Sequence, residues 1–239
     1  MTRIILRGCN GKMGQAITHL LQMKKVDEET NASVSAKIVA GIDVGNERLN
    51  DYPVFTSYKD CDVEADVIID FSSPNNIEEE FEYSKTNNIP IVLCTTGLSD
   101  NQDQMVKDLS KEVAILQAAN MSIGVNMLIK IVKLVSMALV DSGFDIEIVE
   151  KHHNQKVDAP SGTALALANA IKDSLDDDYH YIYDRSHKRE KRESKEIGIS
   201  AVRAGTIVGE HDVIFAWTDE VIELSHTAYS RNIFAKGAI

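Results

Sequence analysis

The chain has 239 residues, which is enough for one large domain or two modest ones. Its composition, 44% hydrophobic and 26% charged, is typical of a soluble globular protein. The formal net charge of −12 argues against a general nucleic-acid or anionic-membrane surface, so an anionic ligand would need locally placed cations.

The N-terminus enters a strand-like run without the apolar stretch and cleavage site of a secretory signal, and no apolar run is long enough for a membrane-spanning helix. The three cysteines, Cys9, Cys61 and Cys94, are far apart and lack a metal-type spacing. We therefore expect a cytoplasmic protein with reduced thiols and no bound metal. Cys9 and Cys94 have no neighbouring partner that would mark a nucleophile, so we interpret them as small packing residues.

The segment "RIILRG" predicts a short apolar strand, and "CNGKMGQAITHLLQM" predicts a turn into an amphipathic helix. Gly8, Gly11 and Gly14 fall at three-residue spacing across that turn. Glycine allows a tight turn and a close approach of the backbone to a pyrophosphate at the helix start. The spacing is GxxGxxG rather than the commoner GxGxxG, so a turn that binds no ligand stays open as the alternative.

The run "AKIVAGID" predicts a second strand, and Asp43 stands at its carboxyl end. An acidic group at that place can accept hydrogen bonds from the ribose hydroxyls of a dinucleotide. An aspartate after a strand is often only a turn residue or a helix cap. Its position relative to the glycine turn favours the binding role.

Three further strands are predicted by "ADVIIDFSSP", "IPIVLCTTGLS" and "VAILQAANMS", with helices over 75–87 and 100–111 between them. The glutamate run 78–80 indicates a solvated helix face. Alternating strands and helices predict a parallel sheet covered on both faces, with ligands at the carboxyl ends of its strands. Small and polar residues recur at those ends, as a cofactor groove needs, although they could simply form loops.

The second half follows a different pattern. The stretch 127–140 predicts a long helix that is apolar nearly all round, which we expect to be buried between two layers. The strand "FDIEIVEKHH", the helix "TALALANAIKDSL" and three closely connected strands within 197–229 follow. They predict an open, mixed or largely antiparallel sheet with helices on one face. The basic stretch 184–196 indicates a mobile, solvated loop, and it could also act as a lid.

The motif "EKHHNQKVDAPSGTA" brings His152, His153 and Lys156 just before the start of an alanine-rich helix at Ser161-Gly162-Thr163. Histidine titrates near neutrality, lysine can donate a proton, and helix N-termini bind anions. The motif therefore predicts a site that receives an anionic molecule and protonates it. An exposed polar loop is the alternative.

Six segments carry a family resemblance: "GCNGKMG", "CTTG", "AANMSIGVN", "EKHHNQKVDAPSGTALA", "VRAGTIVGEH" and "SHTAYSRNIFAKGA". In this order they resemble the 4-hydroxy-tetrahydrodipicolinate reductases, also called dihydrodipicolinate reductases, over essentially the whole chain. The resemblance implies reduction of a cyclic dicarboxylate, 4-hydroxy-tetrahydrodipicolinate, to tetrahydrodipicolinate by NADH or NADPH, on the route to diaminopimelate and lysine.

The same resemblance implies an α/β organisation with a Rossmann-like cofactor domain over 1–122. An α+β domain over 123–230 would bind substrate and, through its open mixed sheet, build a homotetramer. Residues 231–239 would return toward the cofactor domain. Neither nucleic acid nor membrane is expected as a partner.

The resemblance also assigns residues. His152 would be a proton donor or acceptor and Lys156 a proton donor, while His153, Ser161, Gly162 and Thr163 would bind substrate. Asp43 would meet the adenosine ribose. The remaining cofactor contacts would come from Gly8, Cys9, Asn10, Gly11, Lys12, Met13, Cys94, Thr95, Thr96, Ala118, Ala119, Asn120 and Met121. Many family members have a glycine where this chain has Cys94, so the approach of the cofactor is expected to differ slightly there.

The choice of nucleotide depends on Asp43 and the residues next to it, which we call the Asp43 corner. An acid there repels a 2′-phosphate, and Asp43 is followed by Val44, where some relatives carry arginine. Lys12 and Arg48 are the cations that could still reach the phosphate. We therefore expect NADH to be used at least as well as NADPH.

Two other functions stay open from the sequence. One is another two-domain dehydrogenase that acts on a sugar or an amino acid. The other is a non-catalytic dinucleotide-sensing module, which would need the glycine turn and Asp43 but not His152 and Lys156.

Overall fold

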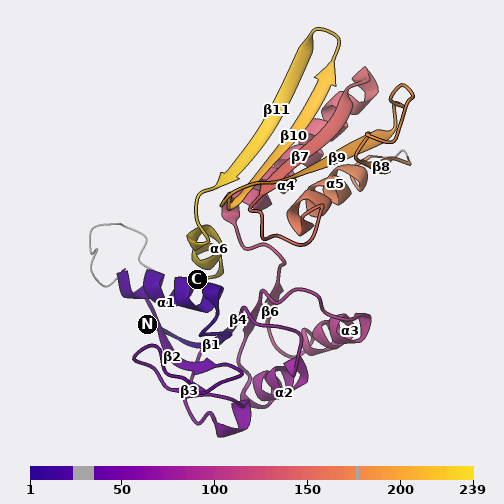
Figure 1. The fold of residues 1–239 in the computed structure, drawn as a ribbon. Helices are drawn as coiled ribbons and strands as arrows, with labels where there is room; N and C mark the ends of the chain where they lie inside the picture. The colour runs from indigo at the N-terminus through magenta and orange to yellow at the C-terminus, as the bar shows by residue number, and fades with distance from the viewer. Residues whose placement is uncertain (24–34, 176–177) are drawn as a thin grey trace. The chain divides into compact units, whose positions relative to one another are not determined.

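The computed structural model describes residues 1–23, 35–175 and 178–239. These residues form two compact units, which are described separately: Met1–Met121 with Arg231–Ile239, and Ser122–Ser230 (Figure 1). Among the described residues, no helix is both long and apolar enough to cross a membrane.

The first unit is built on a parallel sheet that has six strands within the described residues, in the order β3-β2-β1-β4-β5-β6. From β1 the chain proceeds outward through β2 and β3, and β4 then pairs on the other side of β1. This reversal is the switch point at which doubly wound sheets bind ligands. The strands are β1 (Thr2–Arg7), β2 (Ala36–Ile42), β3 (Val54–Phe55), β4 (Val67–Asp70), β5 (Ile91–Leu93) and β6 (Ile115–Gln117).

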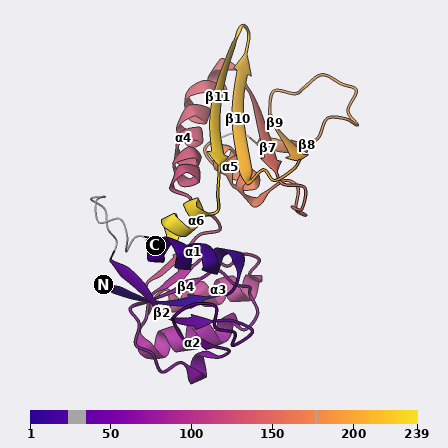
Figure 2. The same ribbon diagram turned by 60° about the vertical axis from the view of Figure 1, so that its left-hand side comes forward.

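Helices cover both faces of this sheet (Figure 2). One apolar cluster packs α1 (Lys12–Met23) and α6 (Asn232–Ala238) on one face. A second packs α2 (Ile77–Asn87) and the 3-10 helix η1 (Tyr58–Asp60) on the other, with α3 (Asp100–Leu109). The predicted Rossmann-like sheet is thus confirmed, whereas β3 and η1 were not predicted because each has only two or three residues.

The second unit contains a mixed sheet with strand order β11-β10-β7-β9-β8 in the described part of the chain. β7 is parallel to β9 and β9 to β8, whereas β10 is antiparallel to β7 and to β11. The strands are β7 (Asp145–His152), β8 (His180–Tyr183), β9 (Glu196–Arg203), β10 (Gly209–Trp217) and β11 (Glu220–Ala228). The predicted open mixed sheet is confirmed, while β8 was missed because it directly precedes the basic stretch.

The helices of this unit are α4 (Ile123–Leu139), the 3-10 helix η2 (Val140–Ser142) and α5 (Gly162–Lys172). Both α4 and α5 pack against the buried side chains of one sheet face. The prediction that α4 is buried between two layers is wrong. It buries Val125, Leu128 and Val132, but Ile123 and Leu134 are 69% and 64% exposed, because among the described residues of the second unit the helix packs on one side only.

The basic stretch 184–196 is held by ion pairs rather than extending freely into solvent. Arg185 and Lys188 both pair with Glu196 at the start of β9. The Arg192 Nε lies 3.1 Å from Glu147 Oε1, and its Nη2 donates to the Ile146 carbonyl at 2.7 Å. These anchors lie at the start of β7, about 16 Å of strand from His152 at its end. The segment therefore does not act as a lid over the motif in this structure.

Candidate active site

The glycine turn lies directly at the carboxyl end of β1. Gly8 has a positive φ of 75°, and a Cβ there would lie 2.7 Å from the Phe71 carbonyl oxygen. A Cβ on Gly14 would lie 2.3 Å from the Gly8 oxygen, so helix α1 can approach its own turn only with glycine. Gly11 and Lys12 are exposed at the start of α1, and Met13 is half-buried. The turn therefore has the shape that brings backbone N–H groups close to a phosphate.

Asp43 ties the end of β2 to this turn. Its Oδ2 accepts a hydrogen bond from the Asn10 N–H at 2.8 Å, and its Oδ1 accepts one from the Val44 N–H at 2.8 Å. The Asn10 amide in turn donates to the Glu47 carbonyl at 2.9 Å. Each carboxylate oxygen retains a second acceptor direction for a ribose hydroxyl.

A cavity of about 250 Å³ opens at the same sheet edge, between the ends of β1, β2 and β4. Asp43 and Glu79 are the acids of its wall, and Arg7 is the cation that the described residues contribute to it. Arg48, in contrast, donates to the carbonyls of Asn50 and Asp51.

The ends of β4 and β5 are joined by side-chain hydrogen bonds. The Thr95 hydroxyl donates to Asp70 Oδ2 at 2.8 Å, and the Ser72 N–H lies 2.8 Å from Asp70 Oδ1 and 3.1 Å from Thr95 Oγ1. Thr95 is buried and Thr96 exposed. After β6, Ala118 and Asn120 are half-buried, Ala119 is exposed, and Met121 is buried.

A buried ion cluster that sequence reasoning missed supports this edge. Arg7 Nη1 lies 3.1 Å from Asp70 and 3.0 Å from Glu80, and both carboxylates are fully enclosed. A further nitrogen of Arg7 donates to the Asn75 carbonyl. The prediction that the run 78–80 is a solvated helix face is therefore wrong for Glu80, since α2 turns this residue inward.

The cysteines of this unit are packing residues. A Cβ on Gly41 would lie 2.5 Å from the Cys9 sulfur, so the thiol fills the space between turn and β2. Burial raises the pKa of Cys9 to about 12 and also raises the pKa of Cys94 and Cys61. All three are free thiols in the structure.

In the second unit His152 ends β7, on the buried face that also contains Ile146, Ile148 and Glu150. Its Nδ1 lies 2.6 Å from Glu150 Oε2. Arg203, at the end of the neighbouring strand β9, meets the same carboxylate through two nitrogens at 2.7 and 2.8 Å. The Ser161 N–H donates to Glu150 Oε1 at 2.9 Å.

These contacts set the charge of the histidine. Burial lowers the pKa of His152 and outweighs the opposing hydrogen bond to Glu150. Burial alone would raise the pKa of Glu150, but the hydrogen bonds from Arg203, His152 and the Ser161 N–H leave it lowered. An ionised carboxylate thus faces a neutral imidazole near pH 7.

Lys156 and His153 lie in the loop that follows. The Lys156 Nζ pairs with Asp158 Oδ1 at 2.8 Å, and the hydrogen bond between them lowers the pKa of Asp158. His153 is half-buried, and its Nδ1 is buried without a hydrogen-bond partner among the described residues.

Helix α5 starts next to this loop. Ser161 is its N-cap, and the Ser161 hydroxyl accepts from the Ala164 N–H at 3.2 Å and lies 3.0 Å from His211 Nε2. A Cβ added to Gly162 would meet nothing within 4 Å, so the start of the helix is open. Thr163 is half-buried in its first turn. Glu150 therefore joins His152 to the start of α5, and Lys156 is close enough to His152 to contribute to the lowered pKa of the imidazole.

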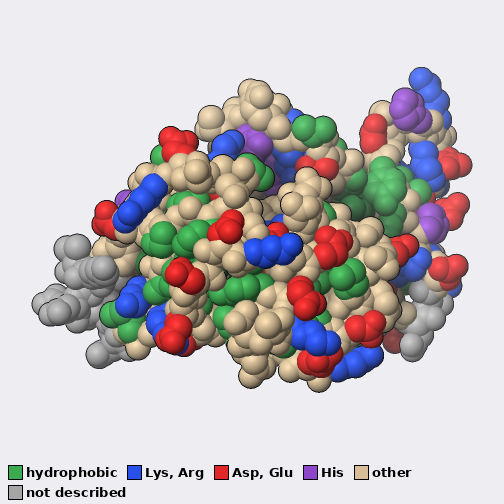
Figure 3. Space-filling model, turned by 90° about the horizontal axis from the view of Figure 1, so that it is seen from below, with side chains coloured by type: hydrophobic (Ala, Val, Ile, Leu, Met, Phe, Trp, Pro, Cys, Tyr) green, Lys and Arg blue, Asp and Glu red, His purple; other side chains and the backbone are tan. Residues whose placement is uncertain are grey.

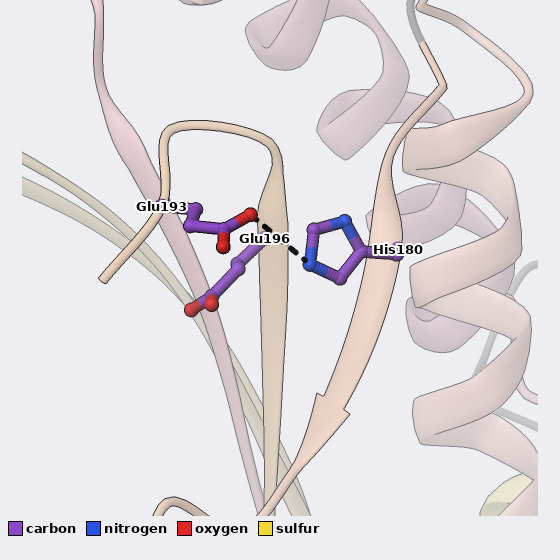
Figure 4. A group of neighbouring side chains, drawn as sticks. All are labelled: His180, Glu193 and Glu196. Atoms are coloured by element: carbon purple, nitrogen blue, oxygen red, sulfur yellow. Dashed lines mark ion pairs between the residues drawn. The ribbon is translucent and has the colours of Figure 1, made fainter. Parts of the chain in front are cut away.

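Another cluster, His180, Glu193 and Glu196, has ligand-type side chains but the electrostatics of an ion-pair network (Figure 4). Glu196 is buried against Arg185 and Lys188, and His180 Nε2 lies 3.9 Å from Glu193. The two cations already compensate for the buried carboxylate.

On the face in Figure 3, acidic and basic side chains are interspersed rather than gathered into one basic field.

The first unit has a doubly wound sheet with a glycine turn at its switch point, and the second has a histidine–lysine loop at a helix start. Together in one chain, these features are those of a two-unit dinucleotide-dependent oxidoreductase. The family model described as "Dihydrodipicolinate reductase, N-terminus" matches residues 2–121, and "Dihydrodipicolinate reductase, C-terminus" matches residues 124–239. The chain therefore belongs to the dihydrodipicolinate reductase family.

Individual relatives agree with the family match. The chain is 50% identical to a 4-hydroxy-tetrahydrodipicolinate reductase of Clostridium novyi and 48% identical to one of Caldanaerobacter subterraneus, in each case over all of this chain and 90% of the relative. A dipicolinate-bound dihydrodipicolinate reductase from Paenisporosarcina sp. TG-14 has the same fold, with a TM-score of 0.75 and 27% identity over 99% of this chain and 91% of that one.

Proposed function

We propose that this chain reduces 4-hydroxy-tetrahydrodipicolinate to tetrahydrodipicolinate with a nicotinamide dinucleotide, in the biosynthesis of diaminopimelate and lysine. The observation that carries the proposal is the Glu150–His152 pair, with Lys156 in the loop that leads to the open start of α5. The chain is also 50% identical to a reductase of that name. This arrangement suits the binding and protonation of a small dicarboxylate. A dinucleotide sensor or a sugar dehydrogenase would not need it.

The first unit fits the cofactor. Gly8, Gly11 and Lys12 would hold the pyrophosphate with the neighbouring Cys9, Asn10 and Met13, and Asp43 would accept from the adenosine ribose. The segments 94–96 and 118–121 would line the nicotinamide side. A bound dinucleotide in its reduced form supplies the hydride.

The residues of the second unit supply the proton and hold the substrate. Lys156 has ammonium protons at Nζ, and one of them would be transferred to the substrate as the hydride is added. Such general acid catalysis contributes about 10²–10⁴-fold to rate. The neutral His152, with its Nε2 available, would orient or exchange that proton. His153 and the α5 start at Ser161, Gly162 and Thr163 would bind the substrate carboxylates.

The Asp43 corner supports use of NADH at least as well as NADPH. The cavity there has two acids, and Arg7 is already committed to Asp70, Glu80 and the Asn75 carbonyl. Arg48 is engaged with backbone carbonyls, so Lys12 is the predicted cation left to meet a 2′-phosphate. A lysine compensates for the acid only partly.

We also propose that the protein is a cytoplasmic homotetramer. Among the described residues, the helices of the second unit pack on one face of its mixed sheet, and an open sheet edge is a template for pairing with another chain. A monomer in light scattering at micromolar concentration would contradict this assembly.

The activity is tested by following NADH oxidation with freshly generated 4-hydroxy-tetrahydrodipicolinate. We expect turnover that depends on both substrates, and dipicolinate should inhibit it. Nucleotide binding without turnover would favour the sensing module, and turnover only with a sugar or an amino acid would favour another dehydrogenase.

A further inference from the structure

Glu150 stands at the centre of the second-unit site, where it contacts His152, Arg203 and the N-cap of α5. Its side chain is fully buried, and its two oxygens accept four hydrogen bonds. Oε2 receives His152 Nδ1 and one Arg203 nitrogen, whereas Oε1 receives the other Arg203 nitrogen and the Ser161 N–H. One carboxylate therefore connects the end of β7, the end of β9 and the start of α5.

This arrangement selects one tautomer of His152. An ionised carboxylate only accepts hydrogen bonds, so the imidazole proton must be on Nδ1 and Nε2 is the free nitrogen. Gly209 on β10 faces that nitrogen, and a Cβ there would lie 3.1 Å from His152 Nε2. The glycine leaves room at the nitrogen that would have to exchange a proton.

The charges around the imidazole come from several elements. Glu150 lies on the same strand, Arg203 on β9, and Lys156 in the loop after β7. His211 on β10 has its ring edge-on at 5.2 Å, and burial lowers its pKa to about 4, so it is neutral near pH 7. Arg203 thus offsets the charge of Glu150, and the imidazole faces a paired carboxylate rather than an isolated one.

Arg203 also fixes the loop that contains Lys156. Its Nη2 donates to the Asp158 carbonyl at 2.6 Å, while the Ala204 N–H donates to the His152 carbonyl at 2.8 Å. Displacement of the Glu150–Arg203 pair would therefore move His152, the 153–160 loop and the α5 cap together.

We propose that Glu150 and Arg203 are the positioning residues of this site: Glu150 holds His152 with Nε2 free and anchors the α5 start, and Arg203 sets the charge that the histidine experiences. The inference rests on the proposed function for its catalytic meaning, but its physical content concerns His152 alone. Removal of either partner must shift the titration of His152, and the two shifts must have opposite signs.

The experiment is an NMR titration of His152, with its ring nitrogens labelled, in wild type, Glu150→Gln and Arg203→Gln. Glu150→Gln removes the negative charge and leaves Arg203, so the pKa of His152 should fall by about one unit or more. Arg203→Gln leaves Glu150 uncompensated, so the pKa should rise by a similar amount. The wild-type spectrum should show the proton on Nδ1.

Two controls keep the test decisive. Glu147→Gln removes a carboxylate–arginine pair from the other end of β7 and should leave the titration of His152 unchanged. Arg203→Lys keeps the positive charge but loses the two-nitrogen contact of the guanidinium, so the pKa of His152 should stay nearer wild type than in Arg203→Gln. If Glu150→Gln does not fold, the comparison of Arg203→Lys with Arg203→Gln still decides the question.

Activity separates this inference from the proposed function. In an active enzyme, Glu150→Gln should lower kcat and raise KM, and the acidic limb of kcat/KM should move with the measured pKa of His152. Opposite NMR shifts in a protein that does not turn over the dicarboxylate would support the positioning and contradict the function. Shifts of equal sign, or a proton on Nε2 in an active wild type, would overturn the positioning role.

Discussion

Each unit has, at its candidate site, a buried cluster of arginine and carboxylate, and these two clusters are built differently. In the first unit Arg7 lies between Asp70 and Glu80, two carboxylates that solvent does not reach. In the second unit Arg203 forms a two-nitrogen contact with the single carboxylate of Glu150, whose remaining positions go to His152 and to the start of α5.

The difference teaches what each cluster can do. The hydrogen bonds around Arg7 end on the Asn75 carbonyl, and those around Asp70 on Ser72 and Thr95, so this cluster holds the loops of the sheet edge. Burial and the nearby Asp70 raise the pKa of Glu80, which fits one arginine shared between two acids. In the Glu150 cluster one arginine compensates for one carboxylate, and that carboxylate is hydrogen-bonded to the imidazole of His152. The first maintains shape, and the second sets a protonation state.

The largest expected effect is on stability in the first unit. Arg7→Met would leave Asp70 and Glu80 facing each other without a cation, which should lower the unfolding free energy by about 3–5 kcal/mol. Arg3→Met, on the same strand, removes only exposed ion pairs with Glu64 and Asp66 and should have a much smaller effect. Urea unfolding by circular dichroism measures both, and equal losses would contradict the contrast.

The second prediction concerns acid stability of the second unit. The pKa of His211 falls from 6.5 to about 4 on folding, so its neutral form stabilises the fold above pH 6.5, and this is lost as pH falls toward 4. The full loss is about 3 kcal/mol. His211→Asn should flatten that part of the pH dependence. Trp217, the chain's single tryptophan, lies at the end of β10 and reports unfolding of this unit. Parallel wild-type and variant curves would refute the assignment.

A smaller effect should separate binding from proton transfer. Thr163→Val removes a hydroxyl at the α5 start, where the substrate carboxylate is proposed to bind. KM for the dicarboxylate should rise about tenfold, with kcat changed less, since one hydrogen bond to a charged group is lost. An unchanged KM in steady-state kinetics would remove Thr163 from the substrate site.

The smallest effect should appear at the Asp43 corner. Val44 is 99% exposed, so Val44→Arg can add a guanidinium without disturbing the core. It should shift kcat/KM toward NADPH, and Lys12→Ala should harm NADPH use more than NADH use. A wild-type preference for NADPH greater than about tenfold, or roughly 1.4 kcal/mol, would contradict the interpretation of this corner.

The two clusters also mark the limit of the sequence prediction. Local patterns predicted the glycine turn, the alternating strands and the histidine motif, because each depends on neighbours along the chain. Asp70 lies 63 positions and Glu80 lies 73 positions after Arg7 in the chain. Glu80 also belongs to an acidic run that suggests a solvent-exposed helix face. Only the packed sheet and α2 bring them together.

The second cluster left a detectable signal. In β7 the alternation places Glu150 on the same face as Ile146, Ile148 and His152, so a charged residue was to be expected in the buried layer. Its partner could not be identified in this way, because Arg203 comes from a strand that pairs with β7 only after a long connection.

The most direct test of the account compares wild type with His152→Ala and Lys156→Ala in two assays, turnover of 4-hydroxy-tetrahydrodipicolinate and equilibrium binding of NADH. Both residues lie in the second unit, away from the glycine turn in the sequence and outside the unit that contains it. The account predicts that kcat falls about 10²–10⁴-fold in each variant while the Kd of NADH stays near that of wild type. Full turnover in both variants would show that the chemistry does not depend on this loop.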